Sequence, residues 1–192
     1  MGKRISDLLA GCLVAAAMLL STTGQASPNS IVVNGDFETG DFTGWTISID
    51  PVFDGVDDAA PQAGTYAAFF GNPDGISEIS QTITTVPGGE YHISFWLQVE
   101  SDAFGNPIPN SFEFDWGGTP ELALSNLAES PYVQYSFDLT ATSTSTELAF
   151  FFSDGPAFLD FDSVSAVPEP GSLALVTLAG GLIAFVRRRR SA

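Results

Sequence analysis

Carboxylates are the side chains of this 192-residue protein with the clearest chemical potential. Of its 23 Asp and Glu residues, only Asp7 and Glu169 lie outside residues 27–166. All six Lys and Arg residues lie at the two ends, so the 21 central carboxylates have no lysine or arginine partner. Carboxylates held close together repel one another, and a divalent cation is the available counter-charge. The composition therefore favours at least one bound Ca²⁺, and the alternative is a solvated acidic surface that aids solubility.

The same charge distribution limits the partners of the central segment. Binding to DNA or RNA requires cations that neutralise phosphates, so we expect no nucleic-acid partner. The single cysteine, Cys12, lies in the N-terminal apolar stretch, so the central segment can form neither a disulfide nor a thiolate metal site.

Residues 91–99 carry a row of side chains suited to sugar binding. In an extended strand, His92, Ser94, Trp96 and Gln98 point to one side. An aromatic ring stacks on the C–H face of a pyranose, and amides bind its hydroxyl groups. His92, Trp96 and Gln98 are therefore candidate glycan-binding residues, although a loop covering Trp96 would remove it from this role. The other two tryptophans are expected in the core.

Catalytic arrangements have little support in the sequence. His92 is the only histidine, it lies inside a predicted strand, and no Gly-x-Ser-x-Gly segment presents a serine beside it. A pair of carboxylates for glycoside hydrolysis is the remaining enzymatic alternative. Because a small domain with short loops offers little cleft, we expect a non-enzymatic protein.

The elements that position these residues are short strands. Alternating apolar and polar residues, interrupted by turn signals such as Pro87-Gly88-Gly89, predict an all-β sandwich or barrel. Residues 54–58 and 72–75 lack the ligand spacing of an EF-hand and are interpreted as acidic turns. The expected strands cover residues 31–33, 66–70, 79–84, 91–99, 111–116, 133–139, 147–152 and 161–165.

The N-terminus predicts export. Lys3 and Arg4 precede an apolar run over residues 8–20, and the small residues Gly24 and Ala26 follow at the positions that a signal peptidase inspects. This pattern indicates a secretory signal peptide over residues 1–26. A lipoprotein signal ending at Cys12 is the alternative, but the apolar run mostly follows that cysteine instead of preceding it.

The C-terminus, residues 167–192, predicts membrane sorting. The Pro168, Glu169, Pro170 motif precedes an apolar stretch over residues 171–186, which is about 24 Å long as a helix. The four residues Arg187, Arg188, Arg189 and Arg190 follow and would hold that end in the cytoplasm. A plain tail anchor is the alternative interpretation.

The order of these three C-terminal features resembles the PEP-CTERM sorting signal. The resemblance implies that an exosortase in the inner membrane recognises the chain and cuts near the Pro168-Glu169-Pro170 motif. It also implies an association with exopolysaccharide at the cell surface or in the extracellular matrix. The protein would be the substrate of the exosortase and transiently anchored in the inner membrane.

The central segment also resembles the galactose-binding-like jelly-roll domains, which include many carbohydrate-binding modules. The similarity lies in residues 34–38 with Gly44-Trp45, then in residues 64–71, 94–97 and 160–164. It implies an antiparallel jelly-roll β-sandwich over residues 27–166, with about eight strands in two sheets, flanked by a signal helix and a sorting helix. Because one fold supports many functions, sugar binding does not follow from the fold alone.

The resemblance also implies where a structural Ca²⁺ would lie. Its ligands would be Glu38, the main-chain oxygen near Asp36, and Asp162 from the last strand. A loop ligand among Asp57, Asp58 and Gln62 stays open. Ser163 departs from the acid or asparagine that often follows the aspartate in this family.

Together these observations give a leading hypothesis of a non-enzymatic, exosortase-sorted surface protein associated with exopolysaccharide. The competing hypothesis is a structural acidic envelope protein without specific glycan binding.

Overall fold

The computed structural model describes residues 29–101, 109–155 and 157–169, and this part contains ten strands. The predicted signal helix, the apolar stretch, Pro170 and the four C-terminal arginines lie outside the described residues. Within the described ranges, no helix is long and apolar enough to cross a membrane. The strands are β1 (Thr46–Ser48), β2 (Asp54–Asp57), β3 (Ala67–Phe70), β4 (Ser77–Thr84), β5 (Glu90–Val99), β6 (Asn110–Trp116), β7 (Thr119–Ser125), β8 (Ser130–Thr140), β9 (Ser145–Asp154) and β10 (Leu159–Pro168).

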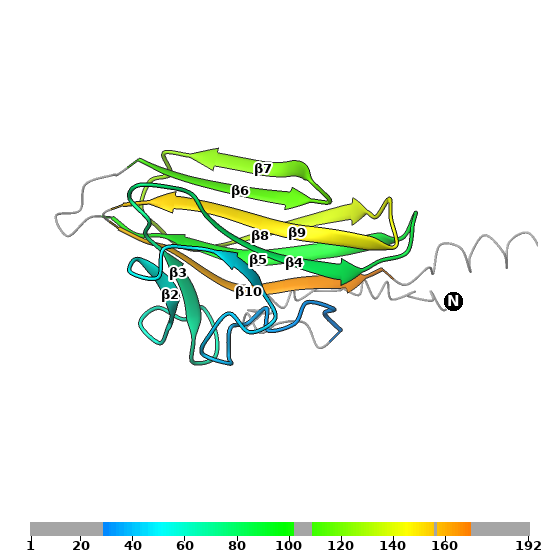
Figure 1. Cartoon of the computed structure of the whole chain (residues 1–192), viewed down its shortest axis with the longest axis horizontal. Helices are drawn as coiled ribbons and strands as arrows, with labels where there is room; N and C mark the ends of the chain where they lie inside the picture. Colours follow the sequence, from blue (N-terminus) through cyan, green and yellow to red (C-terminus); the bar gives the residue numbers. More distant parts are fainter. Residues whose placement is uncertain (1–28, 102–108, 156, 170–192) are drawn as a thin grey trace, which may run out of the picture.

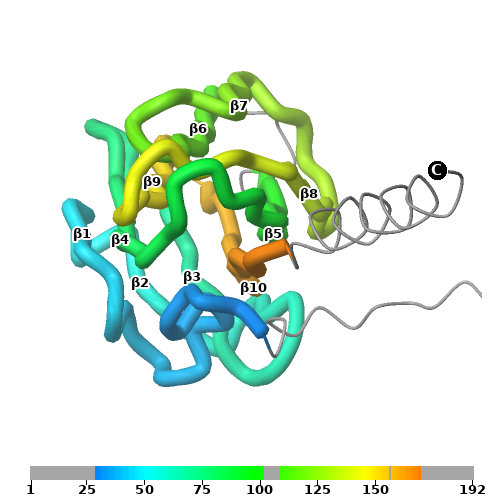
Figure 2. The backbone as a smooth tube through the Cα atoms, turned by 90° about the vertical axis from the view of Figure 1, so that its right-hand side faces the viewer, coloured from blue at the N-terminus to red at the C-terminus, as the bar shows by residue number. Residues whose placement is uncertain are grey.

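The strands form two antiparallel five-stranded sheets, which confirms the predicted jelly-roll sandwich (Figure 1). One sheet has the order β1-β4-β9-β6-β7, and we call it sheet A. The other has the order β2-β3-β10-β5-β8, and we call it sheet B. Viewed from one end, the two sheets curve around a common interior (Figure 2).

The alternation seen in the sequence places one face of each central strand in that interior. In β5, the odd-numbered residues from Tyr91 to Val99 are buried, whereas the even-numbered residues from His92 to Gln98 point outwards. Phenylalanines fill most of the space: the ring of Phe150 lies 5.3 Å from that of Phe95 and 4.9 Å from that of Phe161. Trp45 and Trp116 are buried, as expected from the sequence.

The strand predicted at residues 31–33 is not present. Ile31 N donates to Ala166 O, but the chain then turns, with positive φ at Asn34 and Phe37. This turn inserts Phe37, which is fully buried and stacks on Trp45. Burial of this aromatic pair accounts for the turn in a segment whose apolar residues alone suggested a strand.

The acidic turn predicted at residues 54–58 was also wrong, because residues 54–57 form β2, which pairs with β3. The carboxylate of Asp54 is buried and accepts hydrogen bonds from Asp50 N, Gly71 N and Ser77 Oγ. Asp54 therefore organises the neighbouring turns. The second predicted turn is confirmed, since Asp74 N donates to Asn72 Oδ1.

A bulge in β10 reverses which residues face inwards. Before it, Asp160 and Asp162 lie opposite Gln98 and Trp96 of β5 on the outer face of sheet B. The register then shifts, and Ser163 adopts a φ of 55°. Beyond the bulge, Val164 and Ala166 are buried, and Val164 N donates to Gly35 O. The bulge thus allows β10 to form a main-chain hydrogen bond with the N-terminal turn.

Candidate glycan-binding face and calcium site

The outer face of sheet B carries the aromatic and polar side chains with the best potential to bind a ligand. In this sheet β5 runs between the central strand β10 and the edge strand β8. Trp96 is half-buried and lies between Asp162 of β10 and Gln134 of β8. Next along β5, Gln98 Nε2 donates to Asp160 Oδ2 at 3.1 Å. An aromatic ring is therefore surrounded by amide and carboxylate groups.

The loop between β2 and β3 crosses one end of this face. On β10, Asp162 Oδ2 accepts hydrogen bonds from Gln62 N at 3.0 Å and Ala63 N at 3.1 Å. On β8, Tyr132 Oη donates to Ala60 O at 2.7 Å. Because these contacts lie on the strands on both sides of β5, the loop crosses β5 near Trp96, which is half-buried.

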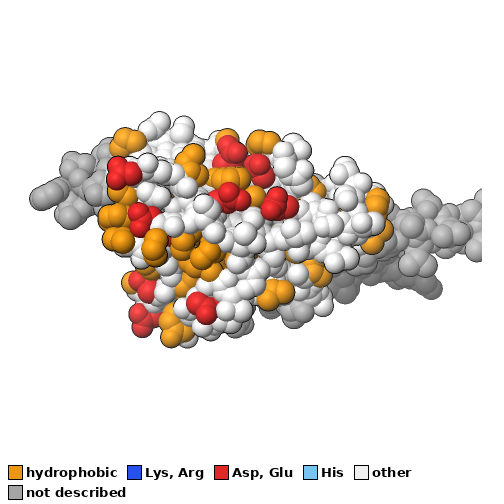
Figure 3. Space-filling model, in the orientation of Figure 1, with side chains coloured by type: hydrophobic (Ala, Val, Ile, Leu, Met, Phe, Trp, Pro, Cys, Tyr) orange, Lys and Arg blue, Asp and Glu red, His pale blue; other side chains and the backbone are white. Residues whose placement is uncertain are grey.

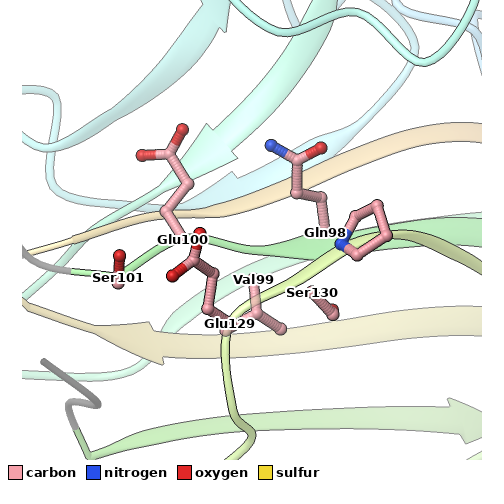
Figure 4. A pocket seen from close by; sticks show the side chains of 7 residues that line it. Gln98, Val99, Glu100, Ser101, Glu129 and Ser130 are labelled. Atoms are coloured by element: carbon pink, nitrogen blue, oxygen red, sulfur yellow. The ribbon is translucent and has the colours of Figure 1, made fainter. Parts of the chain in front are cut away.

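A cavity of about 620 Å³ opens at the end of β5 and the beginning of β8 (Figure 4). Gln98 and Glu100 point to the same side of β5, and Glu129 and Ser130 line the cavity from the beginning of β8. Side chains that offer several oxygen acceptors and one amide suit the hydroxyl groups of a sugar.

Carboxylates dominate the electrostatics around this cavity. Burial, and then the nearby charges of Glu100 and Asp57, raise the pKa of Asp160 to about 7. Burial, followed by the charges of Asp57 and Glu129, also raises the pKa of Glu100. Burial, followed by the charges of Asp160 and Asp162, raises the pKa of Tyr132, so its hydroxyl stays protonated and can donate. The opposite side of the molecule, drawn in Figure 3, also shows acidic side chains and, among the described residues, no Lys or Arg.

The structure separates His92 from the other two predicted glycan-binding residues. Trp96 and Gln98 are neighbours along β5, but His92 lies roughly 20 Å from Gln98 at about 3.3 Å per residue. Its Nδ1 lies 2.6 Å from Asp138 Oδ1 of β8. His92 thus belongs to a different part of the face.

The predicted calcium ligands Glu38 and Asp162 contact the same loop. Glu38 Oε1 accepts hydrogen bonds from Thr65 N and Tyr66 N at 2.7 and 2.9 Å, while Asp162 binds the amides three residues earlier. Gly64 has a φ of 69°, which favours glycine, and a Cβ atom there would displace the Glu38 carboxylate. Asp36 lies half-buried in the preceding turn, two residues before Glu38.

The positive φ of Ser163 gives a physical reason for the family preference noted at this position. Asn and Asp adopt this left-handed region more readily than other side chains that have a Cβ atom. In this chain a serine adopts the left-handed conformation at the bulge, and Ser163 N donates to Asp162 Oδ1 at 2.5 Å.

The fold and these residues agree with the comparison to known families. Residues 29–157, more than half of the chain, match the family model for a carbohydrate binding domain. The chain belongs to that family. Residues 166–190 match the PEP-CTERM protein-sorting motif, so the protein combines a carbohydrate-binding domain with a sorting signal for export and processing at the membrane. No curated protein matches the chain.

Solved structures share the fold of the carbohydrate-binding domain. TmCBM61, determined in complex with beta-1,4-galactotriose, has a TM-score of 0.58 and 19% identity, covering 73% of this chain and 99% of its own. The CBM22-1 xylan-binding domain of Paenibacillus barcinonensis Xyn10C has a TM-score of 0.52 and 15% identity, covering 75% and 96%. At these identities the similarity establishes the fold alone.

Several residues of this face were not singled out by the sequence. Asp160 lies two residues before Asp162, so strand alternation could have placed it on the same face. Tyr132 and Glu100 offered no such signal, because their roles depend on the β2–β3 loop and on the end of β5.

Proposed function

We propose that this protein is a non-enzymatic surface protein, processed by an exosortase, that binds a glycan on the outer face of sheet B. The observation that carries the proposal is the half-buried Trp96 on the outer face of sheet B, beside Gln98 and Gln134 and next to the cavity at the end of β5. Stacking on the ring and hydrogen bonds to these amides would orient a chain of sugars along β5. The exported exopolysaccharide of the same cell is the proposed partner.

Replacing Trp96 by alanine should weaken glycan binding by about tenfold or more, since a stacked aromatic pair contributes about 0.5–1.5 kcal/mol beyond its buried area. The measurement is a glycan array followed by titration with residues 27–169, because β10 extends to Pro168. Phe151→Ala is the matched control, since Phe151 is a half-buried aromatic on the outer face of sheet A. Equal glycan affinity of Trp96→Ala and Phe151→Ala would show that the outer face of sheet B does not bind the glycan.

The same experiment separates the alternative functions. Association that is abolished by salt and EDTA, without preference for any glycan, would identify a structural acidic envelope protein. Release of reducing sugar from the native polysaccharide would instead identify a glycosidase that uses a carboxylate pair.

We also propose that Glu38 and Asp162 hold a structural Ca²⁺ together with main-chain oxygens near Asp36 and in the β2–β3 loop. The oxygen-only donor set suits this ion. Two acids meet at one loop, and Asp162 is fully buried. Burial raises its pKa to about 7 when no cation is present, so a bound cation would relieve the cost of ionising it. The ion would join the first turn to the last strand.

Calcium added to the EDTA-treated protein should increase the free energy of unfolding by about 2.7 kcal/mol at a hundredfold excess over Kd. Glu38→Gln should remove most of this gain, because glutamine keeps the acceptor for Thr65 N but loses the charge. Glu78→Gln, on the outer face of sheet A, should retain it. A gain of the same size in both variants would show that the calcium lies elsewhere.

A further inference from the structure

The only histidine of the chain lies where three neighbouring strands bring it beside two carboxylates. His92 of β5 lies directly opposite Asp138 of β8 and Val167 of β10. Glu169 follows two residues after Val167, and its N–H donates to Glu90 O at 2.9 Å. One ligand atom each from His92, Asp138 and Glu169 lies within 4.8 Å of the others. The two strand registers fix this grouping.

The part of the chain that the structure describes contains no lysine or arginine to neutralise the two carboxylates. Between Arg4 and Arg187 the sequence contains no Lys or Arg, so His92 is the only side chain in this long segment that can carry a positive charge. Asp138 and Glu169 thus converge on a single imidazole. Their repulsion is relieved either by a proton on the ring or by a divalent cation bound among the three groups.

The ligand types indicate which cation fits. An imidazole nitrogen with two carboxylate oxygens suits Zn²⁺ and related transition-metal ions, whereas Ca²⁺ prefers oxygen ligands alone. Zn²⁺ at about 2.0–2.2 Å from each ligand places the ligands roughly 3.3 Å apart. All three side chains are exposed and can reach this spacing by small rotations. A water molecule would complete a tetrahedral site.

We propose that His92, Asp138 and Glu169 bind a divalent transition-metal ion that fastens the sorting motif to sheet B. Glu169 is the central residue of the Pro-Glu-Pro motif, and the preceding Pro168 already pairs with Tyr91 within the sheet. The metal adds a side-chain link to this main-chain pairing. Processing near the motif then requires that the end of β10 detach, and bound metal opposes that step. The site does not depend on the proposed glycan or calcium functions.

The test is a calorimetric titration of the full-length chain in detergent with Zn²⁺, in excess Ca²⁺ so that oxygen-only sites are filled. One equivalent of Zn²⁺ should bind to the unaltered protein. Since an outer-shell partner changes metal affinity 10–100-fold, loss of the ligand in His92→Ala or Glu169→Gln should weaken binding at least about 100-fold. Asp74→Asn, on an exposed turn, is the control and should bind normally. Near-ultraviolet circular dichroism without metal verifies that each variant is folded.

Amide hydrogen exchange at Glu169 is the second measurement. Zn²⁺ should slow exchange of this N–H in the unaltered protein and leave it unchanged in His92→Ala. Unchanged Zn²⁺ affinity in His92→Ala would overturn the site, as would failure of Zn²⁺ to bind at all, which would leave a protonated ring as the counter-charge. Binding without slower exchange would overturn the link to the sorting motif.

Discussion

Phe95→Ala should lower the free energy of unfolding by about 3–5 kcal/mol, the range for removing a fully buried phenylalanine ring. Natural domains have total stabilities of about 5–15 kcal/mol, so this variant loses a large share of its margin. The ring is fully buried at the centre of β5. It contacts six other rings, those of Phe112, Phe114, Tyr135, Phe137, Phe150 and Phe161.

Urea unfolding of residues 27–169 measures this loss. Phe151→Ala removes a ring of the same size from the outer face of sheet A and should cost well under half as much. Similar losses for Phe95 and Phe151 would contradict the assignment of inward and outward faces.

Asp154→Asn should stabilise the protein at pH 8 by up to about 4 kcal/mol, because it removes a buried charge. Asp154 lies at the end of β9, opposite Asn110, and is fully buried. Among the described residues, no donor meets strict hydrogen-bond geometry at either carboxylate oxygen, and the Gly155 N–H only partly offsets the effect of burial on the pKa. Burial, and then the charge of Glu100, raise its pKa to about 7.

The gain should depend on pH in a defined direction. The folded pKa of Asp154 lies above the ordinary value of 3.8, so the folded state binds the extra proton between about pH 4 and pH 7. The unaltered protein therefore loses stability as pH rises through this window, and the advantage of Asp154→Asn should vanish near pH 4. Asp74→Asn is the control for a general change in charge. An advantage that is independent of pH, or none at pH 8, would contradict the buried ionised carboxylate.

Calcium should alter the same pH profile. The pKa of Asp160 and of Asp162 is also raised to about 7, so both add to the loss of stability above pH 4. A cation bound at Asp162 would keep this carboxylate ionised, so Asp162 would no longer contribute to the pH dependence of the free energy of unfolding. The contributions of Asp154 and Asp160 would remain.

Strand alternation made the central part of the fold predictable. Residues 91–99 and 111–116 have a strict period of two, and both form strands with one buried face as expected. The short edge strand β1 has only three residues, all exposed, so no alternation marks it. In β2 the buried residue is Asp54, whose hydrogen bonds to residues far along the chain have no local signal.

The candidate site was predictable only where it lies within one strand. Alternation correctly placed Trp96 and Gln98 together on an outward face, but it could not show that the β2–β3 loop would reach Tyr132 on β8. The proximity of Glu169 to His92 was equally hidden, because the sequence divides the domain from the sorting motif near Ala166. The structure continues β10 through that point to Pro168.

That continuation leaves very little chain between the sandwich and the apolar stretch that begins at Gly171. Three residue steps span at most about 10 Å even when fully extended. A precursor inserted in the membrane through this stretch would hold its acidic domain close to the lipid headgroups, because no long linker separates the two. Before processing, such a precursor would therefore be confined to a thin layer next to the bilayer.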